Sequence, residues 1–167
     1  MTAPRSADTR RAELQFRLAG APRLLVYGLG NVGRQDDGVG VRLVERLEAA
    51  GVRDGVTLDT GYQLAPEDAL TLAGHDAVLF VDATMTPGAP EPYSLQPVAP
   101  ASEISFSTHA LSMGSLLALC ERLYGTAPRA YALAIPAYEF EVNAALSPRA
   151  SARLGRAAAD LIATLKP

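Results

Sequence analysis

A short acidic turn carries the first side chains of this sequence that could do chemistry. The stretch GLGNVGRQDDGVG, residues 28–40, follows an apolar run and places Asp36 and Asp37 side by side. Further along the chain, Asp82 closes the apolar run VLFVD, and His109 lies in the segment STHALS. Two carboxylates and an imidazole that converge from separate loops form a site of oxygen and nitrogen ligands, which suits a divalent transition metal with open coordination positions.

Glycines in the same turn raise a rival interpretation, because Gly28, Gly30 and Gly33 have the G-x-G-x-x-G spacing of a dinucleotide-binding loop. Asp59, at the end of the next predicted strand, stands where a ribose-binding acid would lie. In such loops, however, the helix begins directly after the third glycine so that its amides face the pyrophosphate. Here RQDDG intervenes, and its two carboxylates would repel a diphosphate. We therefore expect the glycines to let the backbone turn tightly, and a nucleotide-dependent, Rossmann-like enzyme is kept as an alternative.

Each candidate residue also has a structural interpretation. Asp36 and Asp37 could cap the helix that follows them, because aspartate is favoured at the N-cap and in the first turn. Asp82 could be a structural acid, and His109 could simply begin a helix. His75 precedes the central predicted strand, so we expect it in a surface loop at the edge of the sheet opposite to Asp82.

Alternating strand and helix patterns must position these residues. Short apolar runs predict strands at 23–28, 76–83 and 129–136, and the segment GVTLDTG predicts a further strand that ends at Asp59. Apolar residues at helical spacing predict helices at 39–51, 65–74, 107–125 and from Ser147 onwards. The Pro-rich segment 85–102 predicts an exposed loop with a short edge strand. The expected fold class is therefore α/β, a three-layer sandwich in which a twisted, mostly parallel sheet of about five strands has helices on both faces.

Length and composition predict one domain and exclude several partners. With 167 residues, 49% of them hydrophobic, the chain can form one compact core, which we place in residues 23–167 with residues 1–22 as an N-terminal tail that could be ordered on the domain. The net charge of −3 and the absence of a long basic run argue against nucleic acid or an anionic membrane as partner. Cys120, the single cysteine, lies on an apolar helix stripe as a small core residue. No segment is apolar enough for export or membrane insertion, so a cytoplasmic protein is expected.

From residue 23 onwards, the order of the motifs resembles the hydrogenase maturation endopeptidases, which trim the C-terminal tail of the large subunit of nickel-iron hydrogenases. The likeness is strongest in GLGNVGRQDDGVGVRLVERL and continues through LDTGYQL, VLFVDAT, STHALS and AIPAYEFEVNAALSP. The segments DTGYQLAPEDA, LLALCERLYG and YEFE look most like the branch that serves NAD-linked bidirectional hydrogenases.

By this resemblance, Asp37, Asp82 and His109 match the family's two metal-binding carboxylates and its metal-binding histidine. Asp59 matches an acidic residue near the cleavage chemistry, and Asp37 stands where some members have glutamate. The resemblance implies catalytic roles for Asp37 and Asp59 and a [NiFe] hydrogenase large-subunit precursor as the partner. It also implies that nickel is contributed by that precursor, with no tightly bound metal of the enzyme's own.

The family's chemistry would explain the acidic turn. The sequence contains no Ser-His-Asp elbow, no H-E-x-x-H motif and no activated cysteine, so nothing in it indicates an ordinary protease. A weak, open site could complete the coordination of nickel already held by the precursor, so that only a loaded precursor is cleaved. Hydrolysis by a metal-polarised carbonyl or by a water activated at Asp59 both stay open. A non-catalytic nickel carrier would use the same residues.

Overall fold

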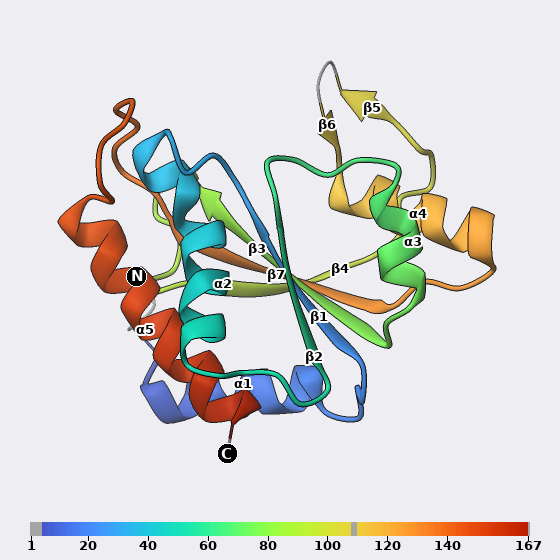
Figure 1. Cartoon of the computed structure of the whole chain (residues 1–167), viewed down its shortest axis with the longest axis horizontal. Coiled ribbons are helices and arrows are strands. Elements are labelled where there is room, and N and C mark those ends of the chain that lie inside the picture. Colours follow the sequence, from blue (N-terminus) through green and yellow to red (C-terminus); the bar gives the residue numbers. More distant parts are fainter. Residues whose placement is uncertain (1–4, 108–109, 167) are drawn as a thin grey trace.

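A computed structural model describes residues 5–107 and 110–166, and at its centre is a five-stranded sheet (Figure 1). From one edge to the other, the strands are β2 (Val56–Gly61), β1 (Leu24–Leu29), β3 (Ala77–Thr84), β7 (Arg129–Pro136) and β4 (Ser94–Val98). Neighbouring strands are parallel except for β4, which runs antiparallel to β7. β4 is the short edge strand predicted within the Pro-rich segment.

Helices cover both faces of the sheet and complete three layers (Figure 1). On one face lie α1 (Ala7–Leu18), α2 (Val39–Ala49) and α5 (Pro148–Leu165). On the other face lie α3 (Asp68–Ala73) and α4 (Met113–Tyr124). The predicted fold class is confirmed. In the part of the chain that the structure describes, no helix combines the length and apolar character needed to cross a membrane.

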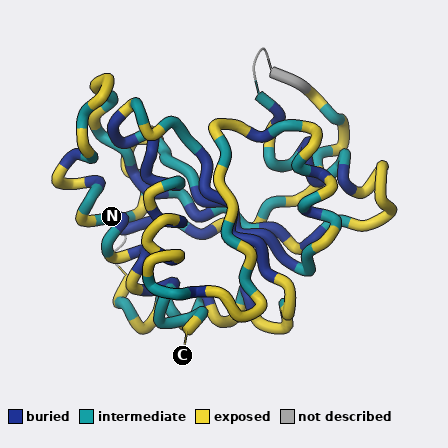
Figure 2. Tube along the Cα trace, in the orientation of Figure 1, coloured by how far each residue is buried: buried dark blue, intermediate teal, exposed yellow. Residues whose placement is uncertain are grey.

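The central strand β3 explains why helices are needed on both sides. Leu79 and Val81 lie in the core beneath α2 and α5, whereas Val78 and Phe80 lie in the core beneath α3 and α4. All four side chains are fully buried, and Figure 2 shows the buried trace running through the middle of the sheet. A strand that is apolar on both faces must be covered twice. Cys120 of α4 is buried in the second of these cores, as predicted.

The start of α4 differs from the prediction. The sequence pattern placed a helix from residue 107, but α4 begins at Met113, where the hydroxyl of the N-cap residue Ser112 accepts a hydrogen bond from the Ser115 amide at 3.1 Å. The residues before it form a short hairpin of β5 (Phe106–Ser107) and β6 (Ala110–Leu111). The prediction that the segment with His109 begins this helix is therefore wrong, and His109 itself lies outside the described residues.

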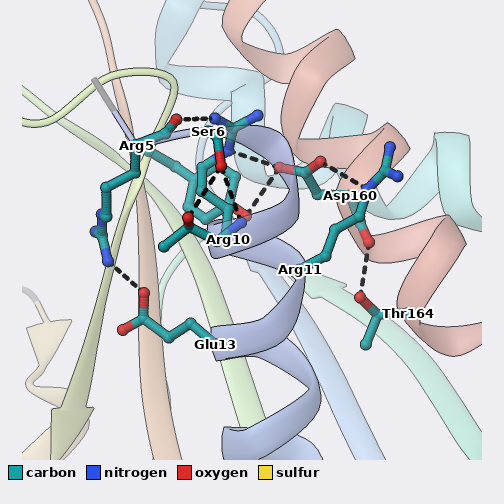
Figure 3. Close-up of polar contacts among 9 residues, drawn as sticks. Arg5, Ser6, Arg10, Arg11, Glu13, Asp160 and Thr164 are labelled. Carbon is teal, nitrogen blue, oxygen red and sulfur yellow. Dashed lines mark hydrogen bonds and ion pairs between the residues drawn. The ribbon is translucent and has the colours of Figure 1, made fainter. Parts of the chain in front are cut away.

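Most of the predicted N-terminal tail forms helix α1, which packs on α5 (Figure 3). Leu14 and Leu18 of α1 are buried in the core shared with α2 and α5. Asp160 of α5, only 2% exposed, accepts hydrogen bonds from Arg10 Nε at 2.7 Å and from Arg11 Nε at 3.2 Å. Apolar packing and a buried ion-pair cluster thus tie α1 to the domain.

Two glycines let α2 lie directly on the sheet. A Cβ atom at Gly28 of β1 would stand 2.3 Å from the carbonyl oxygen of Gly40 in α2. A Cβ atom at Gly40 would stand 2.3 Å from the Val81 carbonyl oxygen and 2.5 Å from that of Leu29. No side chain fits at these distances. The backbones of β1, β3 and α2 are therefore in contact, which fixes the path of the turn between β1 and α2.

We expect Gly28→Ala to lower the free energy of unfolding by about 1–3 kcal/mol, because the added methyl group overpacks a backbone contact. Gly155→Ala in α5 is the control. Its Cβ atom would approach Arg46 Nη1 at 3.5 Å, an ordinary contact, and alanine is favoured over glycine within a helix by roughly 0.5–1 kcal/mol. Urea unfolding checks both variants. If Gly28→Ala has the same free energy of unfolding as the wild type, then α2 can move away from β1 without loss of stability.

Candidate active site at the carboxyl edge of the sheet

A pocket of about 300 Å³ opens at the edge of the sheet where the parallel strands end. Its walls come from the end of β1, the 3-10 turn η1 (Gln35–Gly38), the loop after β2, the end of β3 and the segment before α4. The lining residues are Leu29, Gly30, Asp37, Tyr62, Gln63, Leu64, Asp82, Ala110, Leu111, Ser112 and Met113. Ligand sites of open α/β sheets commonly lie at this edge.

The acidic turn presents Asp37 to the pocket. The Asp37 Oδ2 atom accepts a hydrogen bond from the Asn31 amide at 2.9 Å, so the side chain is held across the turn that follows β1. Gly30 makes this turn possible, because its φ is +132° and a Cβ atom there would stand 1.9 Å from the Asp37 carbonyl oxygen. The expectation that a glycine lets the backbone turn tightly is confirmed at Gly30. Gly28 has a different role, the contact with α2.

Asp36 points the other way and is fully buried. Its oxygens accept hydrogen bonds from the amide and hydroxyl of Ser147 at 2.8 and 2.7 Å, and from the amides of Tyr138 and Glu139 at 2.9 and 3.0 Å. Burial alone would raise the pKa of Asp36, but these hydrogen bonds stabilise the carboxylate and together lower it. Asp36 is therefore structural, although it holds the loop before α5 and does not cap α2 as the sequence suggested.

Asp82 enters the pocket from β3 and is mostly buried. Burial raises the pKa of Asp82 to about 6; a hydrogen bond from the Ala83 amide opposes this shift, and the negative charge of Asp37 adds to it. Among the described residues, the ion pairs do not include Asp37 or Asp82. The two carboxylates therefore face the pocket close enough to repel each other, which is an arrangement that favours a cation.

Asp59 lies on the same face of the sheet but is not among the pocket-lining residues. The prediction that this strand ends at Asp59 is wrong, because β2 continues to Gly61; Asp59 therefore stands within the strand and is exposed. The strand register pairs it with Tyr27, which pairs in turn with Phe80 of β3. Asp82 is two residues beyond Phe80, so the Asp59 backbone lies about 7 Å further from the carboxyl edge. The structure thus places Asp59 beside the pocket and not within it.

Of the two histidines, the structure describes only His75. His109 lies outside the described residues, although the next residue, Ala110, lines the pocket. Within residues 5–107 and 110–166, no three His, Cys, Asp or Glu side chains come together as a metal site. His75 follows α3, and its ring nitrogens contact the Thr71 carbonyl oxygen at 2.7 Å and the Thr57 hydroxyl at 2.8 Å. His75 therefore lies at the opposite edge of the sheet from Asp82, as predicted.

The turn after β1 has the wrong shape for a dinucleotide. Helix α2 begins only at Val39, after η1, so its first amides do not follow Gly33 directly. η1 puts one buried and one pocket-facing carboxylate, Asp36 and Asp37, where the pyrophosphate would lie. An electronegative turn of this kind disfavours a phosphate ligand.

We expect Asp82→Asn to raise the free energy of unfolding at neutral and alkaline pH. The folded-state pKa of about 6 lies above the value of about 3.9 for an unfolded aspartate. The contribution of Asp82 to stability is therefore complete below about pH 4 and is lost as the pH rises through about 6, by on the order of 1–3 kcal/mol. Urea unfolding of the variant and the wild type across this range measures the difference.

The Asp59→Asn variant is the matched control, because it makes the same carboxylate-to-amide change at an exposed position outside the pocket. A constant difference between Asp82→Asn and wild type from about pH 4 to pH 8 would contradict the electrostatic account, because a lost hydrogen bond would then explain the change as well as a lost charge would.

This chain is similar to known proteins in its three-dimensional structure, although sequence comparisons find no match. No protein-family model matches the sequence, and no curated protein matches it significantly. The [NiFe] hydrogenase maturation protease HycI from Thermococcus kodakarensis matches with a TM-score of 0.76 and 23% identity over 93% of this chain and 99% of its own. The hydrogenase maturation endopeptidase HybD from E. coli matches with a TM-score of 0.69 and 25% identity over 86% and 92%.

A third similar structure, the hydrogenase 2 maturation peptidase of a Thaumarchaeota archaeon, has a TM-score of 0.63 and 21% identity over 86% of this chain and 97% of its own. These matches span nearly the whole of the related chains, so the likeness concerns the complete domain and not one motif. The resemblance predicted from the sequence motifs is confirmed: this chain has the fold of the hydrogenase maturation endopeptidases and is similar to these peptidases over most of its length.

Proposed function

We propose that this chain is an endopeptidase that removes the C-terminal extension of a nickel-loaded [NiFe] hydrogenase large-subunit precursor. The observation that carries the proposal is the pair Asp37 and Asp82, which face one pocket at the carboxyl edge of a sheet with the fold of hydrogenase maturation peptidases. The order of the sequence motifs supports it. Service to an NAD-linked bidirectional hydrogenase stays a prediction from the motifs alone.

In this proposal, nickel arrives with the substrate and is recognised by Asp37, Asp82 and His109. A cation between Asp37 and Asp82 would relieve their mutual repulsion and favour the ionised form of Asp82, whose pKa burial raises to about 6. Carboxylate and imidazole ligands suit nickel, and an open site can share it with ligands of the precursor. A precursor without nickel would leave the repulsion in place and bind less well.

The hydrolytic step requires a polarised carbonyl and an attacking water. Nickel held between the two proteins can polarise the carbonyl as a Lewis acid. Asp59 is exposed on the same face of the sheet as Asp82, one strand beyond β1 and outside the pocket lining, so a role as proton acceptor requires a water that lies outside that lining. Asp37 is the nearer alternative, since it lines the pocket itself.

We expect Asp37→Ala, Asp82→Ala and His109→Ala to abolish trimming of a nickel-loaded precursor while the variants stay folded. The first two side chains lie at the pocket and not in the cores, and removing one of two repelling carboxylates can raise the melting temperature. Mass analysis of the precursor's C-terminus follows the reaction. Asp54→Ala, an exposed acid in the turn before β2 at the opposite edge, is the control and should trim at the wild-type rate.

Four outcomes would contradict parts of this proposal or favour an alternative to it. Trimming by Asp82→Ala near the wild-type rate would make Asp82 structural. Equal trimming of nickel-loaded and nickel-free precursor would exclude recognition of nickel. Transfer of nickel to the wild-type chain without any trimming would instead support a carrier, and thermal stabilisation by NAD or NADP, by about 2–4 kcal/mol at saturating ligand, would support the nucleotide alternative.

A further inference from the structure

The buried carboxylate of Asp36 has no part in the chemistry proposed above, yet it is adjacent to Asp37. Asp36 is 0% exposed and accepts four hydrogen bonds from the loop that joins β7 to α5. Three of these reach Oδ2, from the Tyr138 and Glu139 amides and the Ser147 hydroxyl, and the Ser147 amide reaches Oδ1. One side chain thus connects two loops that are about 100 residues apart in sequence.

The neighbours of Asp36 reinforce this connection through the backbone. The Asp36 amide donates to the Glu139 carbonyl oxygen at 3.1 Å, and the Asn143 amide donates to the Gly33 carbonyl oxygen at 2.9 Å. The Gln35 side-chain oxygen accepts from the Glu141 amide at 2.9 Å. Residues 33–36 and 138–147 therefore form one hydrogen-bonded body, and it holds η1 from the side away from the pocket.

Fewer hydrogen bonds hold the side of η1 that faces the pocket. The Asp37 carboxylate has one described hydrogen bond, from the Asn31 amide at 2.9 Å, and its own amide donates to the Arg34 carbonyl oxygen at 3.1 Å within the turn. Gln35, the residue before Asp36, has a φ of +46°, which a non-glycine residue adopts only when its surroundings impose it. The conformation that points Asp37 into the pocket thus depends on contacts made by its neighbours.

We propose that Asp36 is a positioning residue, which fixes η1 against the loop before α5 and thereby sets the direction of the Asp37 carboxylate in the pocket. The inference rests on the proposed peptidase function for its effect on catalysis. Its structural content, that Asp36 determines where Asp37 lies, does not depend on that function. The two adjacent aspartates therefore have different roles: Asp37 contacts the substrate, and Asp36 positions Asp37.

Asp36→Asn is the informative substitution. The asparagine keeps the shape of the side chain, but it replaces one acceptor oxygen with an amide group that only donates. In either orientation, at least one amide of the loop before α5 loses its acceptor. Because a small displacement of a reacting group is sufficient to slow catalysis by about 100-fold, we expect kcat for tail removal to fall at least about tenfold.

Asp160→Asn is the matched control, because it makes the same chemical change at another buried carboxylate, far from the pocket. Asp160 of α5 is 2% exposed and accepts hydrogen bonds from Arg10 and Arg11 of α1 (Figure 3). It also accepts one from the Tyr93 hydroxyl. We expect this variant to unfold at a lower temperature and to keep the wild-type kcat. Both variants are assayed well below their melting temperatures, so that the folded fraction is equal.

A second measurement reports on Asp37 without any substrate. The Asn31 amide donates to Asp37 Oδ2, so its ¹⁵N–¹H cross-peak responds when the carboxylate moves. In Asp36→Asn, we expect this cross-peak to shift toward its position in Asp37→Ala, whereas in Asp160→Asn it should stay at the wild-type position. If Asp36→Asn fails to fold, Ser147→Ala replaces it. This variant removes only the hydroxyl contact to Asp36 and the N-cap of α5, and we expect it to shift the Asn31 cross-peak in the same direction by a smaller amount.

The results separate this inference from the proposed function. A wild-type Asn31 cross-peak and wild-type kcat in Asp36→Asn would overturn the positioning role. An equal loss of kcat in Asp160→Asn would also overturn it, because general destabilisation would then account for both. If the wild-type chain trims no precursor at all, the proposed function fails, and the Asn31 cross-peak alone decides whether Asp36 positions Asp37.

Discussion

The contact between the backbones of β1, β3 and α2 is the constraint on which the site depends. Gly28 and Gly40 remove the side chains that would separate these elements, and α2 consequently begins with its first turn against the Val81 and Leu29 carbonyl oxygens. Because strand and helix are so close, the residues between them cannot run straight across. They leave the sheet at its carboxyl edge and return as η1, which carries the acidic pair to the place where strand ends open into a pocket.

That geometry gives two aspartates near the carboxyl edge, Asp36 and Asp82, opposite environments. Asp36 is enclosed by donors, and their hydrogen bonds lower its pKa in spite of burial, so its charge is stabilised within the fold. Asp82 is also largely buried but has a single backbone donor and a like charge nearby, and its pKa rises to about 6. Burial is common to both residues, and the number of donors decides the sign. The carboxylate with four hydrogen-bond donors belongs to the scaffold, and the carboxylate with one donor faces the pocket.

The sequence predicted the sheet, its edge strand and both helical layers, because the apolar pattern of a strand or a helix can be recognised from the residues of that segment alone. It also predicted that Asp37 and Asp82 belong to one edge, since both follow strand ends. The residue pattern alone could not separate Asp36 from Asp37, and only the family resemblance singled out Asp37, because the donors that enclose Asp36 come from residues 138–147. It also placed the start of α4 too early, at residue 107. Several residues before the apolar stripe could have served as the N-cap, and in the structure Ser112 does so. The sequence predicts only a tail at residues 1–22, because the attachment of helix α1 depends on Asp160, far along the chain.

The electrostatics of the pocket also bear on how a peptidase of this kind could be selective. A site that held its own compensating cation tightly would be ready to act on any peptide. Asp37 and Asp82 instead face the pocket outside the ion pairs of the described residues, and the charge of Asp37 contributes to the raised pKa of Asp82. In the proposed function, the free energy of that repulsion is released only when the substrate brings a metal. Selectivity for a loaded precursor then follows from the unfavourable interaction between two carboxylates, and a rigid scaffold, held by Asp36, is what keeps them from moving apart.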